Sequence, residues 1–375
     1  MDINHQDDEQ KPTLAILTVQ DSHRIFRGNR NNFIDLVRIG RDLGAVVYVV
    51  AAPDLKLTGR KVLGYRYDFK LKKWIKGLLP PPHVVYNRVP YRKMEMLPEV
   101  QQTIQDCMRS NQVTLFNPAF FNKWTLFEWL NKSSQVKKYI PATQQLASSA
   151  ELERLLRDHP IVYLKPVKGK AGKGIMRLER SFIKNKQPEY KLHMQDNNIL
   201  QVSTYHTFEE LWQEVTAQRG NKEYIMQQGI ALTRFNKRVY DLRALIQKTS
   251  KGKWSISGLG ARVAGKRSIT THVPRGGSID DPHKLLASTF GQSRATRIIK
   301  RTKEAALSLA VQIEKSAGYQ LGEMSMDLGI DTSGRIWFFE ANSKPMKFDE
   351  PGIRQKSLER IIGYSMYLTN KAKRR

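Results

Sequence analysis

The chain has 375 residues, of which 40% are hydrophobic, and this is enough apolar material for two or three packed lobes. Its formal net charge of +28 predicts attraction to polyanions such as nucleic acid, anionic polymers or acidic surfaces, without naming a ligand. The single cysteine, Cys107, excludes an intramolecular disulfide and a multi-thiolate metal site, and no segment approaches the ~20 apolar residues of a membrane span.

The first third of the chain alternates short apolar runs with segments of helical periodicity. Its polar, acidic first ten residues lack the basic, apolar and small-residue order of a secretory signal, which predicts an intracellular site. The alternation favours a small parallel α/β domain, in which Cys107 is expected to be a small buried hydrophobic residue of a helix. The expected strands are 13–20, 45–51, 83–87 and 114–116, and the expected helices are 32–43 and 98–110.

The pattern changes after this part of the chain. Residues 117–131 (NPAFFNKWTLFEWLN) combine an Asn-Pro turn signal with apolar side chains at helical spacing, which predicts a helix at a domain boundary. From residue 161 the sequence IVYLKPVKGKAGKGIMRLE predicts a strand, a basic glycine-rich loop and a second, antiparallel strand. The polar tract 184–198 has no clear period and is interpreted as a loop or a weak hairpin.

The rest of the chain predicts a second group of strands with two long helices. The strands are expected at 223–228, 239–248, 253–263, 323–330 and 335–340. One helix is expected at 296–315, and another at 354–369 ahead of the basic tail KAKRR. The residue runs 70–76 and 294–303 are rich in basic side chains.

The strongest local signal comes from acidic and amide side chains in two of these strands. Asp327 lies in EMSMDLGID, and Glu340 and Asn342 lie in IWFFEANSKP. Residues two apart in a strand point to one face, so Glu340 and Asn342 can ligate one ion, and oxygen ligands of this kind suit Mg²⁺. Acids at strand ends are also often solvated surface groups. The apolar surroundings of both acids favour a metal, because burying an unpaired carboxylate is costly.

A second signal is the basic glycine-rich loop that follows Lys165. Glycines let backbone amides approach phosphate oxygens, and a strand lysine supplies them with a positive charge. The spacing matches neither GxxxxGK[ST] nor GxGxxG, so the loop is not a Walker loop or a dinucleotide fingerprint. A flexible basic hairpin tip is the alternative interpretation. The residues concerned are Gly169, Lys170, Gly172, Lys173 and Gly174.

A third signal is Asp241-Leu242-Arg243 in VYDLRALIQK, where the acid and the arginine share a strand face opposite Leu242. An arginine at this place could stabilise charge on a transferring phosphoryl group. Arg262, in the expected neighbouring strand, is a further candidate. Taken alone, the Asp-x-Arg pair is more often a structural ion pair.

Together these segments resemble the ATP-grasp superfamily, in the order expected for it. The order is a boundary-helix lysine, a strand lysine with a glycine loop, a hinge, an Asp-x-Arg strand, and an Asp followed by Glu-x-Asn. The thirteen-residue step from Asp327 to Glu340 and the Asn at position 342 match the magnesium signature of the superfamily. The resemblance covers roughly residues 123–347. More narrowly, NRVPYR, FNKWTLFEWL, YDLRALIQK and EANSKP are similar to the YheC/YheD family of endospore coat-associated proteins.

The resemblance implies ATP and Mg²⁺ as cofactors and assigns roles to individual residues. Lys123 and Lys165 would contact nucleotide phosphates under the loop 169–174, Arg243 would face the γ-phosphate, and Asp327, Glu340 and Asn342 would hold Mg²⁺. The adenine hinge would be residues 226–230, which include Gln227, Gln228, Gly229 and Ile230. Many relatives have a glutamate in the hinge and a further acid for the ribose, whereas this chain has the two glutamines and then Arg234.

The implied fold is an ATP-grasp fold with an N-terminal Rossmann-like domain. The expected division is a polar tail (1–12), a pre-ATP-grasp α/β domain (13–118), a small lobe with the glycine-rich lid (119–226), a large lobe with the metal site (227–349), and a C-terminal helix with a basic tail (350–375).

Three functions compete at this stage. The first is an ATP- and Mg-dependent ligase that joins a carboxylate to an amine or thiol through an acyl phosphate, with a spore or envelope component as substrate. The second is a structural coat-associated protein that keeps the fold without turnover. The third is a nucleic-acid or polyanion binder, indicated by the net charge of +28 and the basic runs 70–76 and 294–303, with an anionic polymer as a partner and no specific nucleic acid expected. The family resemblance implies synthesis in the cytoplasm followed by association with the spore coat and its components.

Overall fold

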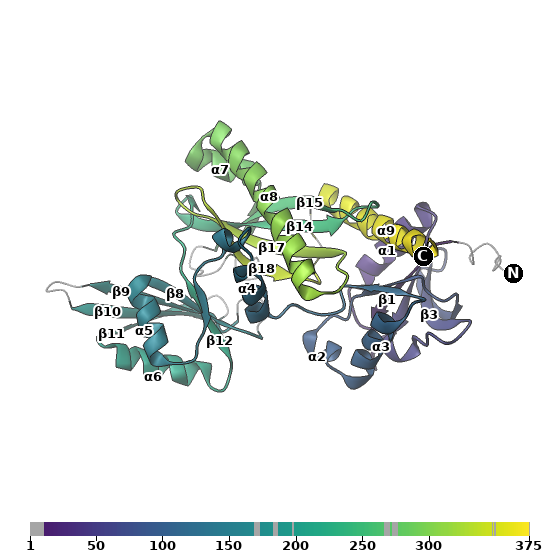
Figure 1. Ribbon diagram of the computed structural model, residues 1–375, viewed down its shortest axis with the longest axis horizontal. Helices are drawn as coiled ribbons and strands as arrows, with labels where there is room; N and C mark the ends of the chain where they lie inside the picture. Colours follow the sequence, from purple (N-terminus) through teal and green to yellow (C-terminus); the bar gives the residue numbers. More distant parts are fainter. Residues whose placement is uncertain are drawn as a thin grey trace.

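In the computed structural model, the residues that the structure describes form three sheets of six strands each, with helices packed against them (Figure 1). The described residues are 11–168, 173–182, 187–196, 199–265, 271, 277–346, 348 and 350–374. Among these residues, no helix combines the length and the hydropathy needed to cross a membrane.

The first sheet has the strand order β4-β3-β2-β1-β5-β6, and its β2, β1, β5 and β6 run parallel. Helix α3 covers one face, while α1 and the C-terminal helix α9 cover the other (Figure 1). The strands are β1 (Thr13–Thr18), β2 (Val46–Ala51), β3 (Val62–Asp68), β4 (Lys73–Leu79), β5 (Val84–Asn87) and β6 (Thr114–Phe116). The helices are α1 (Arg30–Asp42), η1 (Ala52–Asp54), α2 (Arg92–Glu95), α3 (Pro98–Arg109) and α9 (Pro351–Lys373).

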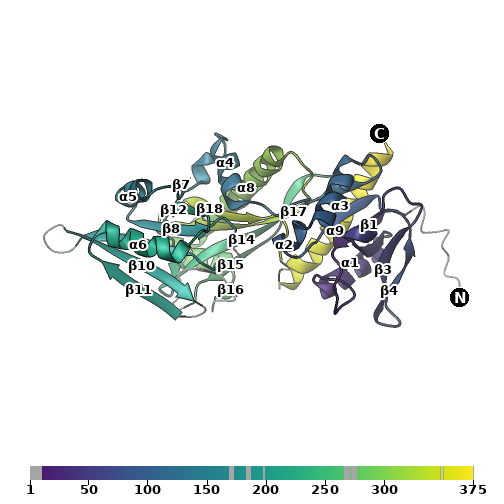
Figure 2. The ribbon, with the colours of Figure 1, turned by 90° about the horizontal axis from the view of Figure 1, so that it is seen from below.

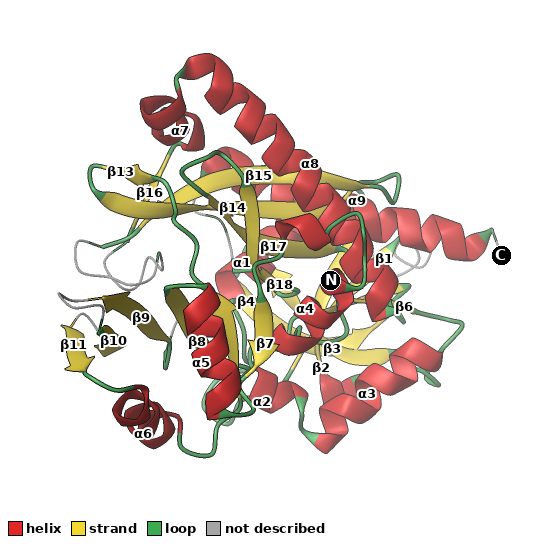
Figure 3. Ribbon diagram, turned by 60° about the vertical axis from the view of Figure 1, so that its left-hand side comes forward, coloured by secondary structure: helices red, strands yellow, loops and turns green. Residues whose placement is uncertain are grey.

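The second sheet has the order β11-β10-β9-β8-β12-β7, and all its neighbouring strands are antiparallel. Helices α5 and α6 pack on one face (Figure 3), so the other face is left to the third sheet. The strands are β7 (Thr143–Gln145), β8 (Ile161–Pro166), β9 (Met176–Phe182), β10 (Pro188–Asp196), β11 (Ile199–Tyr205) and β12 (Tyr224–Gln228). The helices are α5 (Ser149–Asp158) and α6 (Phe208–Arg219).

The third sheet has the order β16-β15-β14-β17-β18, with β13 pairing to β14. Helices α4, α7 and α8 pack on its apolar face around a core of aliphatic residues from β14, β17 and β18. The strands are β13 (Arg234–Phe235), β14 (Arg238–Lys248), β15 (Trp254–Val263), β16 (Ser278–Asp280), β17 (Glu323–Ile330) and β18 (Ile336–Asn342). The helices are α4 (Lys123–Asn131), η2 (Lys137–Tyr139), α7 (Pro282–Phe290) and α8 (Gln292–Ala317).

Most elements lie where the sequence predicts them, including the parallel N-terminal sheet and the buried Cys107 of α3. Helices α5 and α6 and strands β3, β4 and β11 lie in segments for which the sequence predicted no regular element. Within the tract 184–198, residues Pro188–Asp196 are not a loop but form β10, which pairs with both β9 and β11, so the hairpin alternative holds for these residues. The basic run 70–76 forms the turn and second strand of the β3–β4 hairpin, with Lys72 at φ 51°.

Asn117 joins the first sheet to the third. It is fully buried and has a positive φ of 55°. Its side-chain oxygen accepts bonds from the amides of Gly322 (2.7 Å) and Glu323 (3.3 Å), while its side-chain nitrogen donates to the carbonyls of Glu323 and Ser343. The sequence predicted a turn at this Asn-Pro pair. The folded protein shows that Asn117 also links the start of β17 and the segment after β18 to the N-terminal domain through hydrogen bonds.

Candidate active site

The polar face of the third sheet collects the charged residues that the sequence singled out. Along β14 and β17 the side chains of Leu242 and Met326 enter the apolar core, so their neighbours point to the opposite face. In the ladder Asp241 stands opposite Arg262, Arg243 opposite Asp327, and Asp327 opposite Glu340. Residues from four adjacent strands therefore meet on one face of the sheet, in two neighbouring rows of the ladder: Arg262 with Asp241, and Arg243 with Asp327 and Glu340. We call this group the carboxylate row.

A β-bulge in β18 turns the side chain of Glu340 to the face of the sheet that carries Asp327. Asp327 pairs with Glu340, whereas the next residue, Leu328, pairs with Phe338, so Phe339 is the extra residue. Phe338 and Ala341 both lie in the apolar core. Without the extra residue, Glu340 would point to the same side as Phe338, because strand side chains alternate.

Arg262 is held between two carboxylates. Its Nε and Nη2 donate to the two oxygens of Asp241 at 2.9 and 2.7 Å, and Nη2 also lies 2.7 Å from Oδ2 of Asp327. Burial alone would lower the pKa of Arg262, but the charges of Asp327 and Asp241 raise it above its ordinary value. The ion pair of Asp241 is therefore with Arg262 rather than with Arg243, whose Nη1 is 4.0 Å from Asp327 Oδ1 and whose Nη2 donates to Ser325 at 3.3 Å.

Lys123 is the first residue of α4, and its Nζ lies 2.7 Å from Oε1 of Glu340. The helix begins there because the side chain of Asn122 accepts hydrogen bonds from the amides of Trp124 and Thr125. A cation at the positive end of a helix is unfavourable, so this lysine does not serve the helix. Its position places the amine over the strand that carries Glu340.

Lys165 reaches the site from the second sheet. Its Nζ lies 5.5 Å from the centre of the Phe339 ring, where β8 and β12 face the third sheet (Figure 2). The amine donates to Oε1 of Gln227 at 2.5 Å, and the Gln227 amide donates to Thr143 at 2.9 Å. Burial, together with the charge of Lys123, lowers the pKa of Lys165 to about 8, and nearby carboxylates offset part of that shift.

This pKa predicts a pH dependence of phosphate binding. Below pH 8 the Lys165 amine is charged, and above that pH the ligand-free protein holds it neutral. We therefore expect the affinity for a polyphosphate ligand to fall as pH rises from 7 to 9.5, because binding must then restore the proton. Titrations across this range should show the fall in the wild type and a flatter profile in Lys165→Met. An equal slope in both proteins would assign the effect to another group.

The predicted hinge lies at the end of β12. Gln228 exchanges hydrogen bonds with Ala142, through its backbone amide at 2.8 Å and its side-chain oxygen at 3.2 Å. The amide of Gly229 donates to Ile161 at 2.7 Å, and a Cβ at this glycine would lie 2.4 Å from that isoleucine side chain. Ile230 accepts a bond from the Leu232 amide. The segment thus packs closely against the start of β8.

Of the glycine-rich loop, Gly169, Lys170 and Gly172 lie outside the described residues. Lys173 is exposed, and Gly174 has a φ of 73° and accepts a hydrogen bond from the Tyr224 hydroxyl at 2.9 Å. The described end of the loop is therefore attached to β12, the strand that also carries Gln227.

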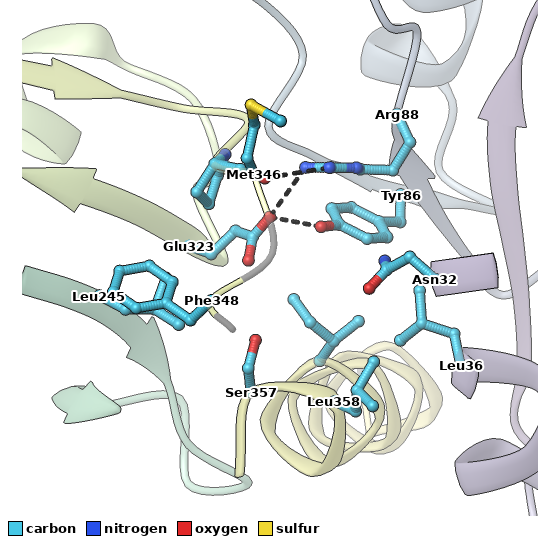
Figure 4. Close-up of a pocket in the computed structure, with 12 residues that line it drawn as sticks. Asn32, Leu36, Tyr86, Arg88, Leu245, Glu323, Met346, Phe348, Ser357 and Leu358 are labelled. Atoms are coloured by element: carbon cyan, nitrogen blue, oxygen red, sulfur yellow. Dashed lines mark hydrogen bonds and ion pairs between the residues drawn. The ribbon is translucent and has the colours of Figure 1, made fainter. Parts of the chain in front are cut away.

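A cavity that the sequence did not reveal lies between the first and third sheets and α9 (Figure 4). Its volume is about 30 Å³, room for about one water molecule. Glu323 accepts hydrogen bonds from the Tyr86 hydroxyl and from Arg88 (3.2 Å), and burial raises the pKa of this carboxyl. The pairing of Arg88 with a buried acid 235 residues later in the chain is visible only in the folded protein.

The donor set fits a magnesium ion that shares its ligands with a phosphate. Asp327 and Glu340 are paired across β17 and β18, and Asn342 stands opposite Ser325 two residue pairs further on, on the same face of the sheet. The described residues contain no group of three or more His, Cys, Asp or Glu side chains that could hold a metal by themselves. One or two carboxylates completed by water and phosphate oxygens is the usual arrangement for Mg²⁺.

Known proteins resemble this chain over most of its length. The family model described as YheC/D like ATP-grasp matches residues 112–368. The endospore coat-associated protein YheD of Bacillus subtilis (strain 168) is 29% identical over 359 residues, which cover 93% of this chain and 76% of that protein. The endospore coat-associated protein YheC of the same organism is 22% identical over 286 residues, 74% of this chain and 75% of that protein.

A solved structure agrees with the architecture. The D-alanyl-alanine synthetase A of Vibrio cholerae O1 biovar eltor strain N16961 superposes with a TM-score of 0.54 at 12% identity, covering 97% of this chain and 99% of that chain. At this identity the likeness concerns the fold alone. The ATP-grasp fold predicted from the sequence is thereby confirmed.

Proposed function

The chain belongs to the YheC/D-like ATP-grasp family, and we propose that it is an ATP- and Mg-dependent ligase that activates a carboxylate as an acyl phosphate and joins it to an amine or thiol. The observation that carries the proposal is the convergence of four cations on three carboxylates between two sheets. The cations are Lys123, Lys165, Arg243 and Arg262, and the carboxylates are Asp241, Asp327 and Glu340.

The proposed reaction has two steps. An oxygen of the substrate carboxylate attacks the γ-phosphorus, the bond to ADP breaks, and an acyl phosphate forms. The amine or thiol then attacks the acyl carbon, loses a proton and releases phosphate. No side chain has to act as a covalent nucleophile, so the protein contributes positioning and charge stabilisation.

Individual residues take roles that follow from their positions. Asp327, Glu340 and Asn342 would hold Mg²⁺, which would neutralise phosphate charge when bound. Lys165, fixed by Gln227, would hold nucleotide phosphates, and Arg243, at the edge of the carboxylate row, would face the transferring group.

Two other functions keep an observation in their favour. Both curated relatives carry the words endospore coat-associated in their names, which supports a coat-associated role for this chain, with or without turnover. The first turn of α8 contains no acidic residue, and the cations at this end of the helix are unfavourable for the helix dipole. Cations that do not stabilise the helix support a binding surface for an anionic polymer. The exposed cations of this stretch, none of which forms an ion pair within the described part of the chain, are Arg294, Arg297, Lys300, Arg301 and Lys303.

The test is calorimetric titration of Mg-ATP into the wild type and into Glu340→Ala/Asn342→Ala, at moderate salt to suppress loose anion binding. We expect saturable, magnesium-dependent binding in the wild type and affinity weaker by about 100-fold or more in the double variant, which lacks two metal ligands. Asp280→Ala, which removes a carboxylate from β16 of the same sheet, should bind like the wild type.

The outcomes separate the three functions. ADP and phosphate released with an acidic acceptor support the ligase, and saturable binding without any release supports a coat-associated protein that keeps the nucleotide. Binding that survives in the double variant but falls steeply with salt supports the polyanion binder.

A further inference from the structure

Each carboxylate of the carboxylate row is already paired with a cation of the protein. Glu340 is paired with Lys123, and Asp327 and Asp241 share Arg262, each at 2.7 Å. The Asp241–Arg262–Asp327 group is almost fully buried, with side-chain exposures of 6 to 7%. Lys123 contacts Oε1 of Glu340 and Arg262 contacts Oδ2 of Asp327, so each cation would compete with a metal ion for its carboxylate.

We propose that Lys123 and Arg262 are resident counter-ions of the metal site, which leave Glu340 and Asp327 for the nucleotide phosphates when metal and nucleotide bind together. The inference rests on the proposed function, because it takes the Mg-ATP site as its starting point. It goes beyond that function by assigning two states to each of these cations.

The contacts of Arg262 allow the exchange without loss of its position. Asp241 binds it through two hydrogen bonds, one to Nε and one to Nη2, and also accepts a bond from Thr271. Arg262 can therefore release Asp327 while Asp241 keeps the guanidinium in place. Asp241 is thus a positioning residue, which explains a buried acid that is not needed as a metal ligand.

Lys123 can exchange for a different reason. Its pair with Glu340 is partly exposed, with side-chain exposures of 18% and 28%, so little desolvation has to be reversed when the pair opens. Lys123 contacts Glu340 and Lys165 lies 5.5 Å from the ring centre of the adjacent Phe339, so both amines lie beside the same part of β18. Phosphate oxygens that bind beside this part of β18 would contact both amines.

The exchange couples the two ligands. A metal ion without nucleotide has to displace Lys123 from Glu340 and Arg262 from Asp327, which leaves Lys123 without its counter-ion and Arg262 with Asp241 alone. A nucleotide without metal draws the same cations away from Glu340 and Asp327. Each ligand alone therefore meets a cost that disappears when both bind, which is positive cooperativity between them.

The test is a titration with Mn²⁺ alone, followed by the electron paramagnetic resonance signal of the free ion. We expect Lys123→Gln to bind Mn²⁺ about fivefold more tightly than the wild type, because the competing amine is gone. The same variant should bind ATP more weakly in the presence of a chelator, because it has lost a phosphate contact. Lys284→Gln, which removes a lysine from the exposed pair with Asp280, is the matched control and should change neither affinity.

A double-variant cycle makes the assignment specific. The gain in Mn²⁺ affinity must vanish in Lys123→Gln/Glu340→Gln, because the freed carboxylate is then absent. Unchanged Mn²⁺ affinity in Lys123→Gln, or a gain that persists in the double variant, overturns the inference. Failure of the wild type to bind Mg-ATP would instead overturn the proposed function. The titration with Mn²⁺ alone would still decide whether Lys123 competes with a metal ion for Glu340.

Discussion

The Arg262→Met variant is expected to lose about 3 to 5 kcal/mol of unfolding free energy, seen as a lower midpoint of urea unfolding. The reason is that Asp241 and Asp327 are buried and share this arginine as counter-ion, at 2.7 Å each. Methionine fills a similar volume, so the loss would come from stranded carboxylates rather than from a cavity.

Two further variants test this explanation. Arg262→Met/Asp241→Asn should recover part of the lost stability, because one of the stranded charges is then removed. Lys284→Met breaks an exposed ion pair and should change stability by no more than about 1 kcal/mol. If Arg262→Met were as stable as Lys284→Met, the buried pair would contribute nothing to the fold.

The Arg243→Gln variant is expected to turn over ATP about 100- to 1,000-fold more slowly, with nucleotide affinity changed by less than about tenfold. Arg243 lies 4.0 Å from Asp327, donates a 3.3 Å hydrogen bond to Ser325 and lies 5.7 Å from the centre of the Phe348 ring, and none of these contacts is a close ion pair. A guanidinium held this loosely is available to charge that develops during phosphoryl transfer. Glutamine keeps a hydrogen-bond donor but removes the charge.

The measurement is ADP release per enzyme, with bound nucleotide determined separately by calorimetry. Arg238→Gln changes an arginine at the start of the same strand, away from the carboxylate row, and should leave turnover as in the wild type. A parallel loss of affinity and turnover in Arg243→Gln would make the residue a binding group rather than a stabiliser of the transition state.

The sequence placed the acidic and basic candidates correctly in strands, and the reason is the alternation of side chains. In β14 and β17 polar residues alternate with residues of the apolar core, so the faces of Asp241, Arg243 and Asp327 can be read directly from the chain. The order of motifs was sufficient for the fold, which the comparisons confirm.

The sequence could not reveal which charges pair. Asp241 was considered with Arg243, two residues away, because local spacing was all that the chain offered. The folded protein pairs it instead with Arg262, twenty-one residues later, because β14 and β15 are neighbours in register. Lys165 and Gln227 were assigned to separate motifs, yet a hydrogen bond joins them across β8 and β12.

The sequence by itself therefore determined the class of fold, the strands that carry the site and the chemical kinds of its residues, because these depend on local periodicity and motif order. The tertiary structure alone decided which residues meet. The bulge at Phe339 is the clearest case, because one extra residue turns Glu340 from the side of the apolar core to that of Asp327. Such a shift depends on the register between two paired strands, and the sequence of either strand alone does not determine that register.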